Sequence, residues 1–150
     1  MDRQKLKVEL KFDEGYRSRA YPCSAGKWTA GFGHLLEGRV SPEELSQYKR
    51  GIKIVTLEQA EEWLDEDIQQ AIYDAQSFFP QFFDLSEVRQ RVLVNMAFNL
   101  GLGKLMKFKQ FRICLQAHEW DQAANEMMDS RWYRQVKGRA ERLVKMMREG

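Results

Sequence analysis

The chain has 150 residues, 43% of them hydrophobic and 31% charged, a composition that excludes a disordered or fibrous protein. A chain of this length forms about one ordinary domain and can bury enough surface to fold without crosslinks. The net charge is +2, no stretch approaches the roughly 18 apolar residues of a membrane-spanning helix, and the N-terminus lacks the apolar core of a secretory signal.

The charges are segregated along the chain. Residues 1–55 carry eleven Lys/Arg against seven Asp/Glu, residues 56–88 carry nine acids and no base, and residues 89–150 carry thirteen bases against six acids. Such a pattern most often reflects solvated helix faces. A basic surface that faces nucleic acid or an anionic cell-wall polymer is the alternative, and charge alone does not separate the two.

The N-terminal third predicts a helix followed by a small β unit. Residues 3–13 have helical spacing with Leu6 and Leu10 on one side. Residues 16–38 hold several glycines among aromatic and β-favouring residues, and this indicates a hairpin or meander. In the string T-A-G-F-G-H, Gly31 and Gly33 are expected to let a ligand approach the bare backbone closely.

The rest of the chain predicts helices only. Residues 41–44 (Ser-Pro-Glu-Glu) and Thr56 are typical N-terminal helix signals, and apolar spacing then indicates a helix over 57–79 that Pro80 ends. Residues 87–100 predict a helix buried on nearly all sides, with Gly101 and Gly103 as its terminators. Further helical patches are predicted over 108–117, 120–128 and 137–148. The fold class is therefore α+β with a dominant helical lobe.

Glu14 is the first candidate for chemistry. It lies directly before Gly15, where the first helix should end, and an ionised acid is unfavourably placed against the dipole at a helix C-terminus. This placement favours the protonated form that a general acid needs. Cys23 and Thr29 lie in the β unit that follows at once, so their side chains can face Glu14. Glycan cleavage needs a proton donor on one side of the bond and a base, nucleophile or positioned water on the other.

These residues carry a family resemblance. The spacing Glu14-x8-Cys23-x5-Thr29, with the string G-K-W-T-A-G-F-G-H-L-L, resembles the phage lysozymes of glycoside hydrolase family 24. The resemblance extends in order through N-M-A-F-N-L-G, W-D-Q-A-A, S-R-W-Y and G-R-A-E-R. It therefore covers nearly the whole chain.

The resemblance implies a lysozyme-like fold: a small β-hairpin lobe over about 12–58, a larger helical lobe over about 59–150 with helix 3–13 packed on it, and a cleft between the lobes. It implies an endolysin, a glycosidase of the lysozyme class. This enzyme hydrolyses the β-1,4 bond between N-acetylmuramic acid and N-acetylglucosamine in peptidoglycan, without metal or cofactor.

The resemblance also implies roles for individual residues. Glu14 takes the place of the general acid and Thr29 that of the hydroxyl lining the water site. Leu35 and Phe98 fall at substrate-binding positions. Arg139 falls at a basic position beside the acid, where a cation favours the ionised carboxylate and so opposes the helix-end effect on Glu14. Which of the two effects prevails stays open.

Cys23 stands where many members of the family carry Asp. A thiol with a pKa of about 8.5 is mostly neutral at pH 7 unless its surroundings lower that pKa. Cys23 could orient a water, act as a base when ionised, or attack the sugar directly. The stereochemical outcome, inversion or retention at the anomeric carbon, depends on which of these occurs.

Two further interpretations concern His and aromatic side chains. His34 is assigned to the substrate side of the hairpin, although a structural role in anchoring a turn is the commoner one. Trp120, Trp132 and Tyr133 lie at helical positions and are interpreted as core rather than as sugar platforms. Two Cys and two His equal the number of ligands of a structural zinc site, but only Cys114-x3-His118 has tight spacing, so no metal is expected.

The sequence also argues against functions other than glycan hydrolysis. A lytic transglycosylase needs no water-positioning pair, and a peptidase-type endolysin needs more His than the chain has. A non-catalytic wall-binding or nucleic-acid-binding module would leave the Glu-x8-Cys-x5-Thr spacing unexplained. We therefore expect a monomer that acts on peptidoglycan glycan strands, with no nucleic-acid partner and no membrane insertion. It is expected to collect in the host cytoplasm and reach the wall through a holin pore.

Overall fold

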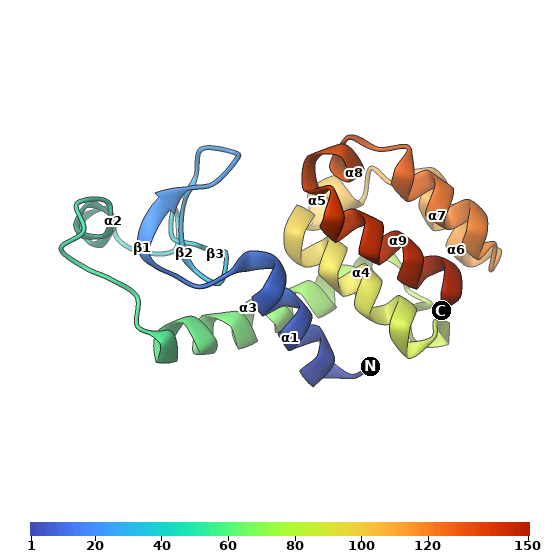
Figure 1. Cartoon of the computed structure of the whole chain (residues 1–150), viewed down its shortest axis with the longest axis horizontal. Coiled ribbons are helices and arrows are strands. Elements are labelled where there is room, and N and C mark those ends of the chain that lie inside the picture. The colour runs from blue at the N-terminus through green and yellow to red at the C-terminus, as the bar shows by residue number, and fades with distance from the viewer. The chain divides into compact units, whose positions relative to one another are not determined.

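The computed structural model describes all 150 residues (Figure 1). Helices dominate, and one small three-stranded antiparallel sheet accompanies them, so the predicted α+β class is confirmed. The chain divides into two compact units. We call Gln4–Gln69 the β-containing unit, and Met1–Arg3 with Gln70–Gly150 the helical unit. None of the helices combines the length and the apolar character needed to span a lipid bilayer.

The β-containing unit builds its sheet from a short stretch of sequence. Its elements are α1 (Arg3–Glu14), β1 (Arg17–Pro22), β2 (Trp28–Gly31), β3 (His34–Leu35), α2 (Pro42–Lys49) and the first part of α3 (Leu57–Phe78). The strands pair in chain order, β1 with β2 and β2 with β3, both antiparallel. Leu6 and Leu10 are fully buried, as the helical spacing of the first segment predicts.

The predicted N-terminal caps of α2 and α3 are confirmed. The Ser41 hydroxyl oxygen accepts a hydrogen bond from the backbone N–H of Glu44 at 3.1 Å. Thr56 Oγ1 accepts from the backbone N–H of Gln59, also at 3.1 Å. Each cap satisfies a donor that the first helical turn leaves open and contributes about 1 kcal/mol. Local signals therefore fix where both helices begin.

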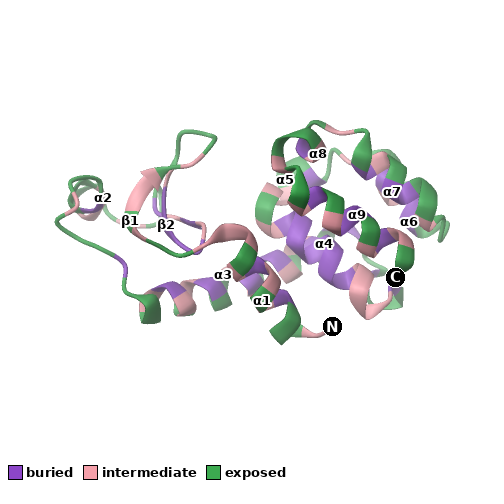
Figure 2. Cartoon of the chain, viewed as in Figure 1, coloured by how far each residue is buried: buried purple, intermediate pink, exposed green.

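The helical unit is built around one buried helix. Its elements are the end of α3, the 3₁₀ turn η1 (Phe82–Asp84), α4 (Glu87–Leu100), α5 (Leu102–Leu105), α6 (Lys109–Gln116), α7 (Trp120–Met128), α8 (Arg131–Val136) and α9 (Gly138–Glu149). Residues 90–97 of α4 are all buried, and Figure 2 shows the middle of this helix in the colour of buried residues. Helices α7 and α8 pack against α9, which also packs against α4.

Two details differ from the sequence prediction. Gly101 ends α4 with φ of +77°, as expected, but Gly103 does not act as a terminator because it lies inside the short helix α5. The pattern also missed α8, whose N-cap is Ser130: its hydroxyl accepts from the backbone N–H of Tyr133 at 3.1 Å. Both helices are too short for apolar periodicity to reveal them.

Candidate active site

Glu14 is the last residue of α1. Gly15 follows with φ of +68°, a left-handed conformation that favours glycine, and its N–H donates to the carbonyl of Lys11 at 2.9 Å. The helix therefore stops at Glu14 as the sequence indicates. The Glu14 side chain, of intermediate exposure, lies at the junction between α1 and the sheet.

The two glycines of the T-A-G-F-G-H string make room for protein groups. A Cβ added at Gly33 would overlap Oε1 of Glu14 and lie 2.9 Å from its Cδ. A Cβ at Gly31 would lie 3.3 Å from Cβ of Ala60 on α3. The close approach that we expected for a ligand is thus made by Glu14 and Ala60. The bare backbone at Gly33 gives the Glu14 carboxyl its place against the sheet.

One face of the sheet carries the polar candidates. Thr29 on β2 is the cross-strand partner of Tyr21 on β1 and of Leu35 on β3, so these three side chains share a face. Cys23 follows Tyr21 by two residues, and the period of an extended chain places it on the same side. The Cys23 N–H still donates to the carbonyl of Lys27 at 2.8 Å, which continues the pairing of the hairpin beyond β1.

Cys23 is held in an environment that favours its ionised form. Burial raises the pKa of the Cys23 thiol, but hydrogen bonds from the backbone N–H groups of Ala25 and Lys27 and from the Thr29 side chain outweigh burial, and the net pKa lies below the ordinary thiol value. Thr29 Oγ1 also lies 3.0 Å from the carbonyl oxygen of Lys27. A hydroxyl has one proton, so Thr29 donates either to that carbonyl or to the Cys23 thiolate. The Thr29 hydroxyl can therefore turn from the Lys27 carbonyl to the Cys23 sulfur when the thiol ionises.

His34 is enclosed by protein groups. It is 4% exposed, its Nδ1 lies 2.7 Å from Oδ2 of Asp67 on α3, and its ring stacks on Trp63 with centroids 4.2 Å apart. Arg39 Nη1 donates to the other oxygen of Asp67 at 2.8 Å. These contacts tie β3 to α3, which fits the anchoring interpretation of His34. Its assignment to substrate binding stays a prediction.

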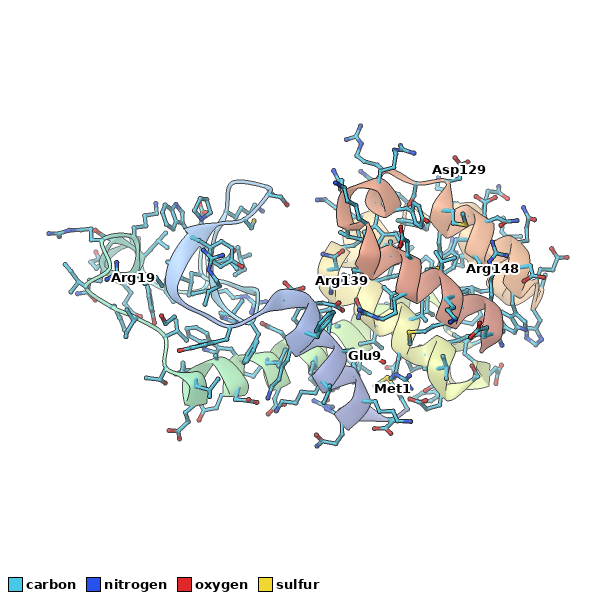
Figure 3. All side chains as sticks on the ribbon, viewed as in Figure 1. Met1, Glu9, Arg19, Asp129, Arg139 and Arg148 are labelled. Carbon is cyan, nitrogen blue, oxygen red and sulfur yellow. The ribbon has the colours of Figure 1, made fainter.

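Phe98 and Arg139 belong to the helical unit and are described there. Phe98 lies near the end of α4 with intermediate exposure. Arg139, labelled in Figure 3, lies in the first turn of α9, and its Nε donates to Oδ1 of Asn95 at 2.9 Å. Glu14, Cys23, Thr29, His34 and Leu35 all belong to the β-containing unit.

The aromatic residues of the helical unit differ in burial. Trp132 is 3% exposed and its indole N–H donates to Oδ1 of Asn99 at 2.7 Å, so it is a core residue with its polar atom satisfied. Trp120 and Tyr133 are only half-buried. The guanidinium of Arg89 lies 4.0 Å from the Trp120 ring centroid, and the His118 ring stacks on Trp120 at 5.2 Å. Packing contacts therefore occupy this indole.

The cysteines show no metal or disulfide chemistry in their arrangement. Cys23 and Cys114 are both free thiols, and no three His, Cys, Asp or Glu side chains are grouped so that they could hold a metal ion. Burial, and then the charges of Glu126 and Glu119, raise the pKa of the Cys114 thiol. The pKa values of the two thiols therefore move in opposite directions, and Cys23 is the one that ionises more readily.

Sequence reasoning missed Tyr21 as a member of this face. Its signal was the two-residue period: Tyr21 lies two positions before Cys23 in a segment predicted to be extended. Its position opposite Thr29 depends on the strand register, which shifts between Arg17 and Tyr21. The register cannot be read from spacing alone.

The contact between Gly33 and Glu14 gives a prediction. Gly33→Ala should lower kcat/KM by roughly 100-fold, because the new methyl displaces the Glu14 carboxyl and misplacement of about 1 Å costs that much. The matched control is Gly38→Ala. Gly38 has a similar φ, +84°, but no atom within 4 Å of an added Cβ. Both variants should lose comparable stability in thermal unfolding, and equal activities would disprove a catalytic effect of the contact.

Comparisons with known proteins identify a family for the chain. The model of a family described as phage lysozyme matches residues 11–148. The chain is 26% identical over 97% of its length to a probable T4-type lysozyme of Dictyostelium discoideum and covers 94% of that protein. It is 33% identical over 63% of its length to an endolysin of Acyrthosiphon pisum secondary endosymbiont phage 1, covering 56% of it.

A third relative is longer. The chain is 30% identical over 94% of its length to the pre-baseplate central spike protein Gp5 of Enterobacteria phage T4, of which it covers only 27%. The chain therefore matches nearly all of one relative and a single segment of another.

Proposed function

Since the chain belongs to the phage lysozyme family, we propose that it hydrolyses the β-1,4 bond between N-acetylmuramic acid and N-acetylglucosamine in bacterial peptidoglycan. Family membership makes it a lysozyme-type glycosidase. The bond, and lysis of a bacterial host as the biological outcome, are parts of the proposal.

One observation carries the mechanism: an acid at the end of α1 lies against a sheet that presents a thiol and a hydroxyl in hydrogen-bond contact. In the proposed reaction Glu14 gives its proton to the glycosidic oxygen as the bond to the anomeric carbon breaks. Cys23 and Thr29 hold the water whose oxygen joins that carbon, and ionised Cys23 takes the proton that the water loses. Direct attack by the Cys23 thiolate is the alternative.

The remaining predicted residues enter the proposal as substrate contacts. Leu35 is next to Thr29 across the sheet, which supports a place beside the bond to be cleaved. Phe98 and Arg139 are carried over from the family pattern alone. One relative is named an endolysin, which supports the proposal that this enzyme passes from the host cytoplasm to the wall. We propose that it does so as a monomer, through a holin pore.

The products of purified peptidoglycan test the proposal. Hydrolysis should give muropeptides with a free reducing N-acetylmuramic acid end, each one water heavier than the 1,6-anhydro product of a transglycosylase. Mass spectrometry of the digest, before and after borohydride reduction, separates the two. Anhydro ends, or reducing ends on N-acetylglucosamine, would contradict the proposed bond cleavage.

A further inference from the structure

Tyr21 lies on β1, an edge strand, and belongs to the sheet face described above. It is the direct cross-strand partner of Thr29, and Cys23 follows it by two residues. The guanidinium carbon of Arg17 lies 4.3 Å from the centroid of its ring, so a cation–π contact limits where the ring can turn. Its side chain is half-buried.

The Tyr21 hydroxyl has no hydrogen-bond partner within the β-containing unit, and Tyr16 provides the contrast. The Tyr16 hydroxyl donates to the carbonyl of Val55 at 2.5 Å and so holds the loop before α3 against β1. The Tyr21 hydroxyl oxygen is not a buried, unsatisfied atom, so water reaches it, and an oxygen of a bound ligand can replace that water. Tyr16 and Tyr21 therefore differ: the Tyr16 hydroxyl serves the fold, and the Tyr21 hydroxyl is available to a ligand.

Burial, together with nearby negative charge, favours the protonated form of the Tyr21 hydroxyl. Burial raises the pKa of Tyr21, the nearby Glu14 carboxylate raises it further, Arg17 partly opposes the effect, and Cys23 adds to it. Tyr21 is therefore an O–H donor at any pH at which a glycosidase of this kind works. The Tyr21 phenol is close enough to Glu14 and to Cys23 for both of their charges to affect its pKa. In the proposed reaction these two groups flank the glycosidic bond that is cleaved.

We infer that Tyr21 is a substrate-binding residue whose hydroxyl donates a hydrogen bond to an oxygen of the bound glycan, either a sugar hydroxyl or an N-acetyl carbonyl. Arg17 fixes the ring in the orientation that this contact needs. The inference rests on the proposed function, because it takes the ligand to be a glycan strand.

The experiment measures binding of purified peptidoglycan glycan fragments to Glu14→Gln, which cannot turn them over, with and without Tyr21→Phe. Removal of one hydrogen bond should weaken binding by about threefold to tenfold. In the enzyme that retains Glu14, Tyr21→Phe should lower kcat/KM by a similar factor.

The thermal midpoint of Tyr21→Phe should not fall, because the ring and its contact with Arg17 remain. Tyr16→Phe is the matched control, expected to lower the thermal midpoint and leave kcat/KM unchanged.

Equal binding by Glu14→Gln with and without Tyr21→Phe would overturn the inference and leave the proposed function intact, since wild type would still release reducing ends. A fall in the thermal midpoint that matches that of Tyr16→Phe would also overturn it, by assigning Tyr21 to the fold. Absence of reducing ends with wild type would overturn the proposed function and the inference together.

Discussion

Glu14→Gln should fold normally and lose roughly 100-fold to 10,000-fold in lytic rate, the range that a positioned general acid contributes. The amide has the size of the carboxyl and fits the space that Gly33 leaves, but it cannot give a proton to the leaving oxygen. Without that proton, the sugar oxygen must leave as an alkoxide. The assay is the fall in turbidity of chloroform-permeabilised Gram-negative cells, with circular dichroism to establish the fold.

Glu44→Gln is the control for this change. Glu44 lies on α2, and its carboxylate pairs with Lys53 at 3.2 Å with both side chains nearly half-exposed. Such a surface pair contributes about 0–1 kcal/mol, so its loss should alter neither stability nor lysis measurably. If Glu14→Gln kept even a tenth of the wild-type rate, Glu14 could not be the general acid.

Local chemistry explains which parts of the fold were predictable. The hydroxyls of Ser41 and Thr56 cap the next turn of chain, and Gly15 ends α1 through its own backbone conformation. None of these signals depends on distant residues. The Glu-Cys-Thr spacing was also informative, because a short hairpin directly after a helix keeps all three side chains within one small unit.

Contacts between segments that are distant in the sequence could not be predicted from the sequence patterns. The stacking of His34 on Trp63 joins residues from a strand and from α3, and periodicity gives no partner for either. The Glu14 carboxyl packs against the backbone of Gly33, and this contact depends on the angle at which α1 meets the sheet. A glycine in a string tells us that space is needed, and only the packing tells us which group fills it.

The second large effect is expected at Cys23. Cys23→Ala should lose most activity, because a methyl group can neither orient nor deprotonate a water. Cys23→Asp should stay active, since a carboxylate is fully ionised at neutral pH. The structure adds accessibility to this test: Cys23 is half-buried with a lowered pKa, whereas Cys114 is buried with a raised pKa. A thiol-directed alkylating agent should therefore modify Cys23 first, and a Cys114→Ser background makes the assignment clean.

The pH profile reveals whether ionisation of Cys23 takes part in the reaction. If the reaction needs protonated Glu14 and ionised Cys23, kcat/KM is bell-shaped and its optimum lies midway between the two pKa values. The hydrogen bonds from Ala25, Lys27 and Thr29 lower the Cys23 pKa and move that optimum toward lower pH than an ordinary thiol would give. Cys23→Asp replaces the thiol by a group that ionises near 3.9, so the optimum should fall by up to about two pH units.

An unchanged optimum in Cys23→Asp would mean that the charge on sulfur has no part in the reaction. The anomer formed first then separates the two roles of an ionised Cys23: inversion indicates a water that Cys23 activates, and retention indicates a covalent glycosyl-enzyme. Full activity after stoichiometric alkylation of Cys23 would exclude both roles, because an alkylated sulfur can neither take a proton nor attack carbon. Thr29, which shares its single hydroxyl proton between Lys27 and the sulfur, would then be left to hold the water without its neighbour.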